Sequence, residues 1–161
     1  MREITLNCKI ITSLFMGGAN QQAELRTQSL NGLFRYWFRL LGGSFEDEKR
    51  LFGWGGENAN KGLVSINLNF GNVLKGIFEK VFDNRGFVIQ SRGINYLGFA
   101  LDQRFKRQDN KPRREYLREN QDFTLTFRFH PKATDEDIKK FLCAVWCAFY
   151  LGNFGSRSRR G

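Results

Sequence analysis

The chain of 161 residues is long enough for a domain with a buried core, and its 26 Lys and Arg against 16 Asp and Glu give a net charge of +10. This excess favours a polyanionic partner, either nucleic acid or an acidic membrane surface. No apolar run reaches the roughly 18 residues of a membrane span, and the first ten residues lack the apolar core of a signal peptide. We therefore expect a cytoplasmic protein without a membrane partner.

The three cysteines, Cys8, Cys143 and Cys147, are odd in number, and two of them lie four residues apart in an apolar stretch with helical spacing. This pattern is typical of buried thiols in a reducing compartment and not of a disulfide scaffold. Two neighbouring cysteines and the single histidine, His130, are too few for a metal site at credible spacing. We expect neither a metal nor another cofactor.

The chain begins with a predicted strand over residues 3–12, where apolar and polar residues alternate. The apolar side of this half-buried strand consists of Ile4, Leu6, Cys8 and Ile10. Residues 13–22 follow as a loop, in which Gly17 and Gly18 allow the backbone to approach a ligand closely.

A long helix is predicted over residues 30–41, where apolar residues recur at helical spacing. Ser29 is the expected N-cap, and Gly42 with Gly43 the expected end, since glycine accepts the left-handed conformation of a C-terminal cap. Gly32 lies inside the helix, which suggests that something packs closely against its backbone. The apolar stripe consists of Leu30, Leu33, Phe34, Trp37 and Leu41.

Three arginines, Arg26, Arg35 and Arg39, accompany this helix, and residues 26–43 contain no Asp or Glu. Arg35 and Arg39 are four residues apart, so they share one side of the helix. One interpretation is that these are solvated or loosely paired surface arginines. Because the segment holds no carboxylate to neutralise them, we favour an anionic partner from outside the helix.

A second, short helix is predicted over residues 46–52, ended by Gly53. Residues 53–62 are rich in Gly and Asn and are expected to form an exposed loop. Trp54 within this loop either folds back onto the core or provides a platform on which a base stacks.

The middle of the chain contains a clear alternating strand over residues 63–70 and then weaker patterns. Residues 74–82 are compatible with a short helix or with a strand that ends in a turn, and residues 87–89 and 94–101 are predicted strands. Residues 102–120 hold seven Lys and Arg against four Asp and Glu. We interpret them as a mobile hairpin tip or insertion; a disordered solvated loop and a contact with single-stranded nucleic acid are the alternatives.

The last third contains the clearest strand, residues 122–130, and a second long helix. Thr134 and Asp137 form a predicted capping box at the start of this helix. The second half of the helix, residues 141–151, is apolar nearly all round, so we expect it to be deeply buried. Its apolar stripe consists of Ile138, Phe141, Leu142, Val145, Trp146 and Phe149.

The strongest chemical signal is GNFGSRSRRG, residues 152–161. Its glycines permit tight turns whose uncovered N–H groups make an anion-binding nest, and its arginines match phosphate oxygens in pairs. The alternative interpretation is a flexible basic tail. The spacing does not fit the P-loop pattern, so ATP binding is not predicted.

The order of these elements predicts an α+β, ferredoxin-like β-α-β-β-α-β sheet with helices on one face and loop insertions. Two segments also resemble a known family. LFMGGANQQAELRTQSLNGLFRYWFRLLGG, residues 14–43, with RLFG close behind, is similar to the first half of the RAMP proteins of CRISPR systems, and residues 152–161 resemble the glycine-rich loop that marks their end. The combination is most similar to the first-subunit family of the Cmr (type III-B) effector complex.

This resemblance implies an RRM-like module that binds RNA through its first helix and its glycine-rich loop. Such subunits usually carry two modules, so we expect residues 1–161 to be a single RAMP module, the amino-terminal half of a longer protein. The expected partners are CRISPR guide RNA and other Cmr subunits, with no small-molecule substrate. The candidate RNA-binding residues are Arg26, Ser29, Asn31, Gly32, Arg35 and Arg39 in the helix motif, Lys61, and Gly152, Gly155, Ser156, Arg157, Arg159, Arg160 and Gly161 in the loop motif.

Three functions remain open from the sequence. The first is a non-catalytic RNA-binding subunit that helps to hold or cap the guide RNA in antiviral defence. The second is a metal-independent RNA endonuclease, as some RAMP relatives are; its base would be His130, for which a structural or solvent-facing role is the better interpretation. The third is a scaffold that binds neighbouring subunits through exposed aromatic residues such as Trp54.

Overall fold

The computed structural model describes residues 2–18, 20, 22–57 and 59–155, and the chain divides into two compact units. We call residues 1–9, 26–72 and 122–154 the helical unit, and residues 10–25, 73–121 and 155–161 the loop-rich unit. Both units contain antiparallel strands, so the α+β class predicted from the sequence is confirmed.

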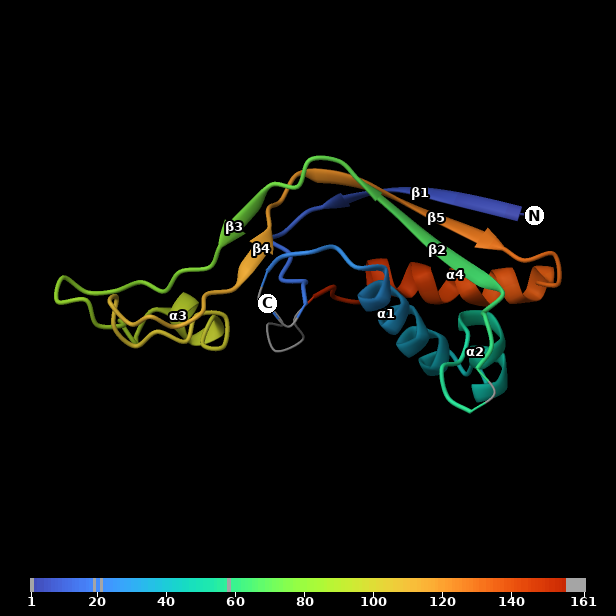
Figure 1. The fold of residues 1–161 in the computed structure, drawn as a ribbon, viewed down its shortest axis with the longest axis horizontal. Helices are drawn as coiled ribbons and strands as arrows, with labels where there is room; N and C mark the ends of the chain where they lie inside the picture. Colours follow the sequence, from blue (N-terminus) through green and yellow to red (C-terminus); the bar gives the residue numbers. More distant parts are fainter. Residues whose placement is uncertain (1, 19, 21, 58, 156–161) are drawn as a thin grey trace. The chain divides into compact units, whose positions relative to one another are not determined.

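The helical unit is built on a three-stranded sheet with the order β1-β5-β2 (Figure 1). Its strands are β1 (Arg2–Ile10), β2 (Val64–Phe70) and β5 (Gln121–Phe129). β2 runs antiparallel to β5, with Ile66 opposite Phe127. β1 also runs antiparallel to β5, because Arg128 donates to Glu3 at 2.7 Å while the Thr5 and Thr126 hydroxyls lie 3.1 Å apart. The three predicted strands at 3–12, 63–70 and 122–130 are thus confirmed.

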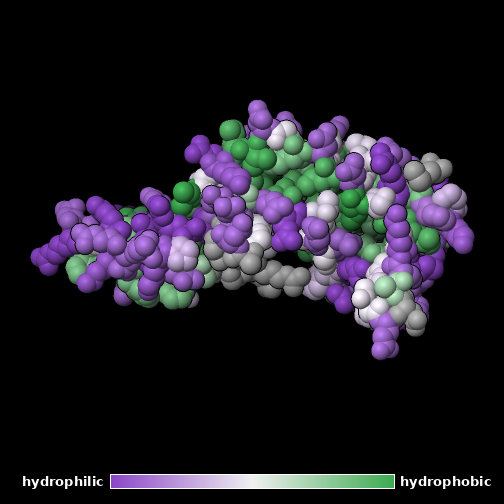
Figure 2. All heavy atoms as spheres, in the orientation of Figure 1, coloured by the Kyte–Doolittle hydropathy of each residue, from purple (hydrophilic) through white to green (hydrophobic). Residues whose placement is uncertain are grey.

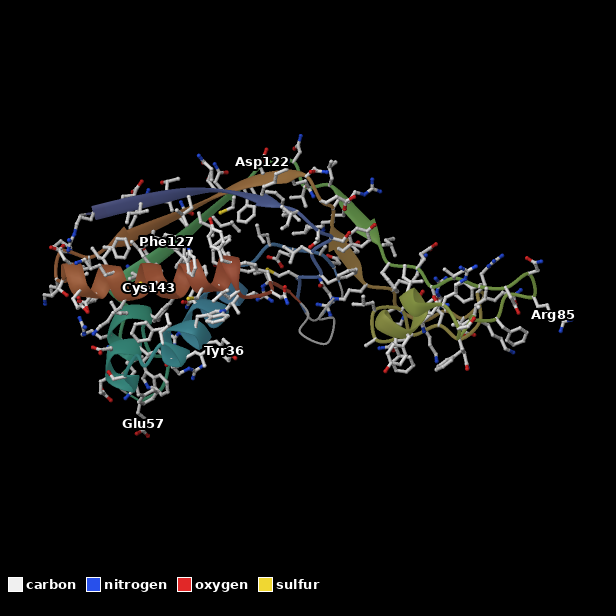
Figure 3. The ribbon with its side chains drawn as sticks, turned by 180° about the vertical axis from the view of Figure 1, so that it is seen from behind. Tyr36, Glu57, Arg85, Asp122, Phe127 and Cys143 are labelled. Carbon is white, nitrogen blue, oxygen red and sulfur yellow. The ribbon has the colours of Figure 1, made fainter. Side chains whose placement is uncertain are left out.

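One face of this sheet carries the core, where α1 (Thr27–Leu40) and α4 (Asp135–Tyr150) pack, while α2 (Phe45–Phe52) packs against α1. Phe127 points from the sheet toward the helices (Figure 3). Its ring centroid lies 6.0 Å from that of Phe34 on α1 and 5.1 Å from that of Phe141 on α4. The alternation of β5 therefore positions both helices on the same face, as predicted.

Helix α1 differs in detail from the prediction. It begins at Thr27 with Arg26 at the N-cap position, so Ser29 lies inside the first turn and is not the cap. The fully packed stripe consists of Leu30, Phe34 and Phe38. Leu41, expected in that stripe, is exposed because the helix has ended and Gly42 turns the chain with a φ of 85°. A Cβ on Gly32 would meet nothing within 4 Å, so the close packing expected there is absent.

Helix α4 confirms the predicted capping box but not the deep burial of its second half. The Thr134 hydroxyl accepts from the Asp137 N–H at 3.1 Å, and the Asp137 carboxylate accepts from the Thr134 N–H at 2.9 Å. Trp146 and Tyr150 are 55% and 72% exposed, and their rings stack 4.9 Å apart. Only the face that holds Ala144, Val145 and Ala148 is packed, because the sheet and α1 lie on one side of the helix.

The cysteines occupy three different environments. Cys147 is buried as predicted, Cys143 is exposed contrary to prediction, and Cys8 is half-buried. Burial raises the pKa of the Cys8 thiol to about 11, so that thiol stays protonated at neutral pH.

The loop-rich unit contains a small sheet of β3 (Lys75–Ile77) and β4 (Glu115–Leu117), and a short helix, α3 (Gly93–Leu97). The strand predicted over 94–101 is wrong, since α3 and turns occupy those residues. Phe87 and Val88 form single bridges with Lys106 and Phe82 instead of the predicted strand.

Residues 102–120 are anchored at both ends of the segment, and the mobility expected for its tip stays a prediction. The Asp102 side chain is fully buried and accepts from the Arg104 guanidinium at 2.8 and 3.0 Å and from the Lys80 N–H at 3.1 Å. β4, at the end of the segment, pairs with β3. Within the described residues, no helix is long and apolar enough to cross a membrane.

Candidate nucleic-acid interface

Arg35, the central arginine of the predicted RNA-binding helix, is engaged inside the protein. Its guanidinium lies 3.5 Å from the Glu48 carboxylate, donates to the Phe52 carbonyl at 3.1 Å and also donates to the Gly53 carbonyl. These two carbonyls belong to the end of α2, where helix C-termini carry partial negative charge. Arg35 therefore caps α2 from α1.

Arg39 remains accessible, but it shares the same carboxylate. Its Nε lies 3.5 Å from Glu48 Oε2, and its side chain is 58% exposed while that of Glu48 is 5% exposed. The expectation that no local carboxylate neutralises these arginines is therefore wrong. Segment 26–43 indeed holds no acid; the partner comes from α2. Sequence reasoning missed Glu48 because Glu46, Asp47 and Glu48 are consecutive and only the packing of α2 selects one of them.

The N-terminal end of α1 is the more open part of the candidate interface. Arg26 occupies the N-cap position without a side-chain cap hydrogen bond, and the first turn contains no acidic residue. The first N–H groups of α1 thus lack the side-chain acceptor that Ser29 was predicted to supply. Ser29 is exposed and Asn31 half-buried within the first turns. An uncapped helix N-terminus of this kind favours a negatively charged ligand.

The glycine-rich segment begins directly against α1. A Cβ on Gly152 would lie 2.8 Å from Nε1 of Trp37 on α1 and 2.6 Å from the Ala148 carbonyl oxygen of α4. Glycine is therefore required there by packing alone. Gly152 thus lies against Trp37 of the helix motif, and a meeting of the two arginine-bearing motifs stays a prediction. Among the described residues, the buried Trp37 Nε1 has no hydrogen-bond partner.

The rest of the loop motif is only partly described. Gly155 belongs to the loop-rich unit, has a φ of 89°, and would bring a Cβ to 2.7 Å from the Phe15 carbonyl oxygen. That φ strains any other residue, so glycine is needed for conformation as well as for space. The remaining predicted positions lie outside the described residues: Ser156, Arg157, Arg159, Arg160 and Gly161.

A platform on which a base stacks stays a prediction for Trp54, in the loop after α2. Trp54 is 36% exposed and does not fold back onto the buried core, contrary to the other prediction. Its ring meets Phe45 edge-on at 5.3 Å, and the Lys49 ammonium lies 5.3 Å from its centre. Lys61 in the same loop is exposed, and within the described residues no hydrogen bond or ion pair joins it to α1. Its neighbour Gly62 lies close to Gly53, whose carbonyl Arg35 binds, and the role of Lys61 in RNA binding stays a prediction.

The most strongly bound arginine of the unit was not singled out from sequence. Arg50 on α2 forms two hydrogen bonds with the Asp137 carboxylate of α4, at 2.8 and 2.5 Å, and a further one with Asp47. Hydrogen bonds from Arg50 hold the pKa of Asp137 far below its ordinary value, and those from Asp137 hold the pKa of Arg50 above its own. This pair fastens α2 to α4 and engages both terminal nitrogens of Arg50.

His130, the candidate base for RNA cleavage, lies exposed just after β5. Its Nδ1 accepts from the Lys132 N–H at 3.2 Å. Within the described part of the chain, no group of three or more His, Cys, Asp and Glu side chains is placed to hold a metal ion.

Comparisons with known proteins agree on one family. A family model described as the RAMP superfamily matches residues 7–161. The CRISPR system Cmr subunit Cmr1-2 of Pyrococcus furiosus is 30% identical over 180 aligned positions, which cover 100% of this chain and 92% of that protein. The crystal structure of Cmr1 from Pyrococcus furiosus in its apo form is similar in fold, with a TM-score of 0.63 at 22% identity. That match covers all of this chain but 47% of the crystallised one, so the chain spans about half its length. The resemblance predicted from the two sequence motifs is confirmed, and the chain belongs to the RAMP superfamily.

Proposed function

We propose that this chain is a non-catalytic RNA-binding subunit of a type III-B CRISPR (Cmr) effector complex, which helps to hold or cap the guide RNA in antiviral defence. The observation that carries the proposal is the 30% identity, over the whole chain, to a protein named a Cmr subunit. The net charge of +10 supplies the electrostatic attraction that a guide-RNA partner requires.

The RNA backbone is proposed to run along α1, from its first turn to Arg39 in its last turn. Arg26 at its start, the uncapped first turn and the exposed guanidinium of Arg39 offer donors to phosphate oxygens. Gly152 brings the beginning of the glycine-rich segment against Trp37 of the same helix. This supports a shared phosphate-binding surface of helix and loop, with Arg35 as a structural member.

The open face of the sheet is less suited to RNA than α1. RRM domains stack bases on aromatic residues of this face. Here the outward-facing positions of the three strands are polar. They include Glu3, Thr5, Asn67, Asp122 and Thr126. A polar face without rings offers bases no aromatic surface on which to stack. We therefore place the RNA on the helical side.

The proposed module is the ferredoxin-like β-α-β-β-α-β fold. The strand order β1-β5-β2 and the antiparallel pairing agree with three adjacent strands of such a sheet, with α1 and α4 as its two helices. The loop-rich residues 73–121 then form an insertion in a single RAMP module.

Salt dependence of RNA affinity tests the proposal. If about five phosphates are neutralised, log K should fall against log salt with a slope near −3.5 for single-stranded RNA. Arg39→Ala removes one exposed guanidinium, so we expect the slope to become less steep by about 0.7. Arg128→Ala, which removes an arginine paired with Glu3 on the outer face of the sheet, is the matched control and should leave the slope unchanged. A flat salt dependence in the wild type would reject RNA binding.

The double variant Arg157→Ala/Arg159→Ala addresses the loop motif. Phosphate contacts carry no sequence information, so we expect it to weaken binding to different RNA sequences alike. A loss confined to one RNA sequence would contradict the proposed backbone contact.

Catalysis by this subunit is the competing function. General base catalysis requires a group near the 2′-hydroxyl, and His130 uses Nδ1 to accept a backbone N–H after β5. We expect guide RNA to remain intact on incubation with the wild-type protein. Cleavage that is abolished by His130→Ala would replace the proposed function with an endonuclease.

A scaffolding role can coexist with RNA binding, and the stacked pair Trp146–Tyr150 favours it. These rings are exposed on α4, on the side that neither the sheet nor α1 covers. We expect Trp146→Ala/Tyr150→Ala to reduce assembly with co-expressed Cmr subunits while leaving affinity for free RNA unchanged. Full assembly of this variant would remove α4 from the subunit interface.

A further inference from the structure

Residues 79–114 of the loop-rich unit, which we call the aromatic lobe, expose several large rings. Four aromatic side chains are between 48% and 80% exposed: Phe87, Tyr96, Phe99 and Phe105. Figure 2 shows hydrophilic residues over much of this lobe, with apolar patches between them. Rings of this size are normally buried or placed at a binding surface.

Each of the exposed phenylalanine rings in the lobe lies beside a cation. The Lys80 ammonium is 5.4 Å from the ring centres of both Phe99 and Phe105. The Lys111 ammonium also lies 4.8 Å from the ring centre of Phe105, and the Lys106 ammonium lies 5.2 Å from that of Phe87. Cations and rings therefore alternate over the surface, which is the composition of a single-strand binding platform.

A cleft of about 320 Å³ opens between these side chains. Its lining includes Tyr96, Phe99, Phe105 and Lys80, together with the amides of Gln90 and Asn95. This volume is at the small end of ligand pockets, and the lining combines flat apolar surfaces with a few polar groups. A flat heteroaromatic ring with hydrogen-bonding edges matches that chemistry.

The cleft is held in shape by buried polar groups. The Asn95 amide donates to the carbonyls of Val81 and Ile89 at 2.8 Å each and accepts from the Val81 N–H at 2.7 Å. The Lys80 ammonium donates to the Arg104 carbonyl at 3.0 Å. Because these bonds fix the segments that carry the rings, little ordering is needed when a ligand enters.

Basic side chains outnumber acidic ones in the aromatic lobe. The lobe holds nine Lys and Arg and four Asp and Glu, and all four acids are engaged. Glu79 pairs with Arg113 and Asp102 with Arg104, while Asp83 and Asp109 accept backbone N–H groups. Within the described residues, seven cations of the lobe form no ion pair: Lys80, Arg85, Arg92, Lys106, Arg107, Lys111 and Arg114. Figure 3 shows Arg85 at the outer tip of the lobe.

We propose that the cleft of the aromatic lobe binds an unstacked base of single-stranded RNA, stacked against Phe105 and Phe99, with the flanking phosphates on Lys106 and Lys111. This rests on the proposed RNA-binding function and adds a second contact to the one at α1. Stacking on rings accepts any base, so the contact is tolerant of sequence.

Two probes of equal charge separate base binding from phosphate binding: a uridine decamer, and a decamer of abasic ribose phosphates. For the full chain we expect about tenfold tighter binding of the uridine decamer. Phe105→Ala and Phe99→Ala should each reduce that preference several-fold, and leave the abasic affinity unchanged. Phe105→Trp should retain the preference, and Tyr150→Ala, which removes an exposed ring on α4, should not alter it.

Equal binding of the two decamers by the wild type would overturn the base pocket while leaving RNA binding intact. An equal loss for both decamers in Phe105→Ala would also overturn it, as would an unchanged preference in both alanine variants. If the wild type binds neither decamer, the proposed RNA-binding function is overturned, and the base pocket with it.

Discussion

At the scale of single residues, arginines of the same segment have different roles. Arg35 and Arg39 lie one turn apart on α1, yet Arg35 is enclosed by two carbonyls at the end of α2 while Arg39 is largely exposed. Glu48 lies within 3.5 Å of both. An arginine that donates to several internal acceptors has few donors left for phosphate, so Arg39 is the better test of ligand binding.

The ion pair between Arg50 and Asp137 yields a pH-dependent prediction. The pKa of Asp137 is lowered in the folded state from its ordinary value of 3.8. The ionised carboxylate therefore stabilises the folded state above about pH 3.8, and this stabilisation is lost as the pH falls further. We expect Asp137→Asn to reduce the free energy of unfolding by about 2 kcal/mol at pH 7. This loss is smaller than for a fully buried ion pair, because Arg50 is itself partly exposed. Urea unfolding from pH 7 to pH 2 should show the difference shrink below about pH 4.

Asp135→Asn is the matched control for this measurement, because Asp135 lies in the same first turn but is exposed. Its effect should stay within about 0.5 kcal/mol. A loss in Asp137→Asn that is the same at pH 2 and pH 7 would contradict the assigned ion pair.

At the scale of elements, the helices combine local signals with partners from elsewhere in the chain. The start of α4 follows from its capping box, which needs only residues 134 and 137. The packed face of each helix depends on what lies opposite. α1 buries Phe38, which the sequence stripe left out, because Phe52 of α2 lies 5.5 Å away.

Two glycines give opposite predictions for the same substitution. Gly32→Ala should stabilise the protein by about 1 kcal/mol, because the position is in the interior of α1 and open space surrounds it. Gly152→Ala should destabilise it, because the Cβ would meet Ala148 and Trp37 at under 3 Å. Thermal unfolding of both variants tests the pair.

The Gly32→Ala variant also separates the effect of packing from that of ligand binding. If RNA approaches the α1 backbone there, Gly32→Ala should lose RNA affinity while gaining stability. A destabilised Gly32→Ala protein would contradict the open environment of this glycine, and a tolerated Gly152→Ala would contradict the close contact with Trp37.

At the scale of the whole molecule, each of the two units has its own packed centre. The helical unit is built around Phe34, Phe127 and Phe141. The aromatic lobe of the loop-rich unit depends on a buried charge, Asp102, which orders Arg104 and the Lys80 backbone. A lobe with few buried apolar side chains is thus held by hydrogen bonds.

Asp102→Asn should therefore loosen the lobe selectively. We expect faster amide hydrogen exchange in residues 79–114 and unchanged protection in β5 and α4, because the latter are held by their own aromatic core. Glu119→Gln, at an exposed carboxylate that accepts from Ser13, is the control and should change neither region. Equal acceleration in both units would contradict separate cores.

The sequence by itself determined the three long strands, the start of α4 and the family. Strand alternation, a capping box and short motifs are local patterns, so they can be recognised without knowing the neighbours. The contact between Gly152 and Trp37 of the first helix joins residues far apart in the chain, and no local pattern specifies it.

The tertiary structure alone decided which charged side chains are paired and which aromatic rings are exposed to solvent. Glu48 between two arginines, the buried Asp102 and the exposed Trp146 all depend on residues distant in the chain. A residue's type fixes the interactions it can make, while burial and partners fix which of them it does make. Sequence periodicity therefore located the long strands and helices, and only their packing separated structural arginines from those that remain accessible to a ligand.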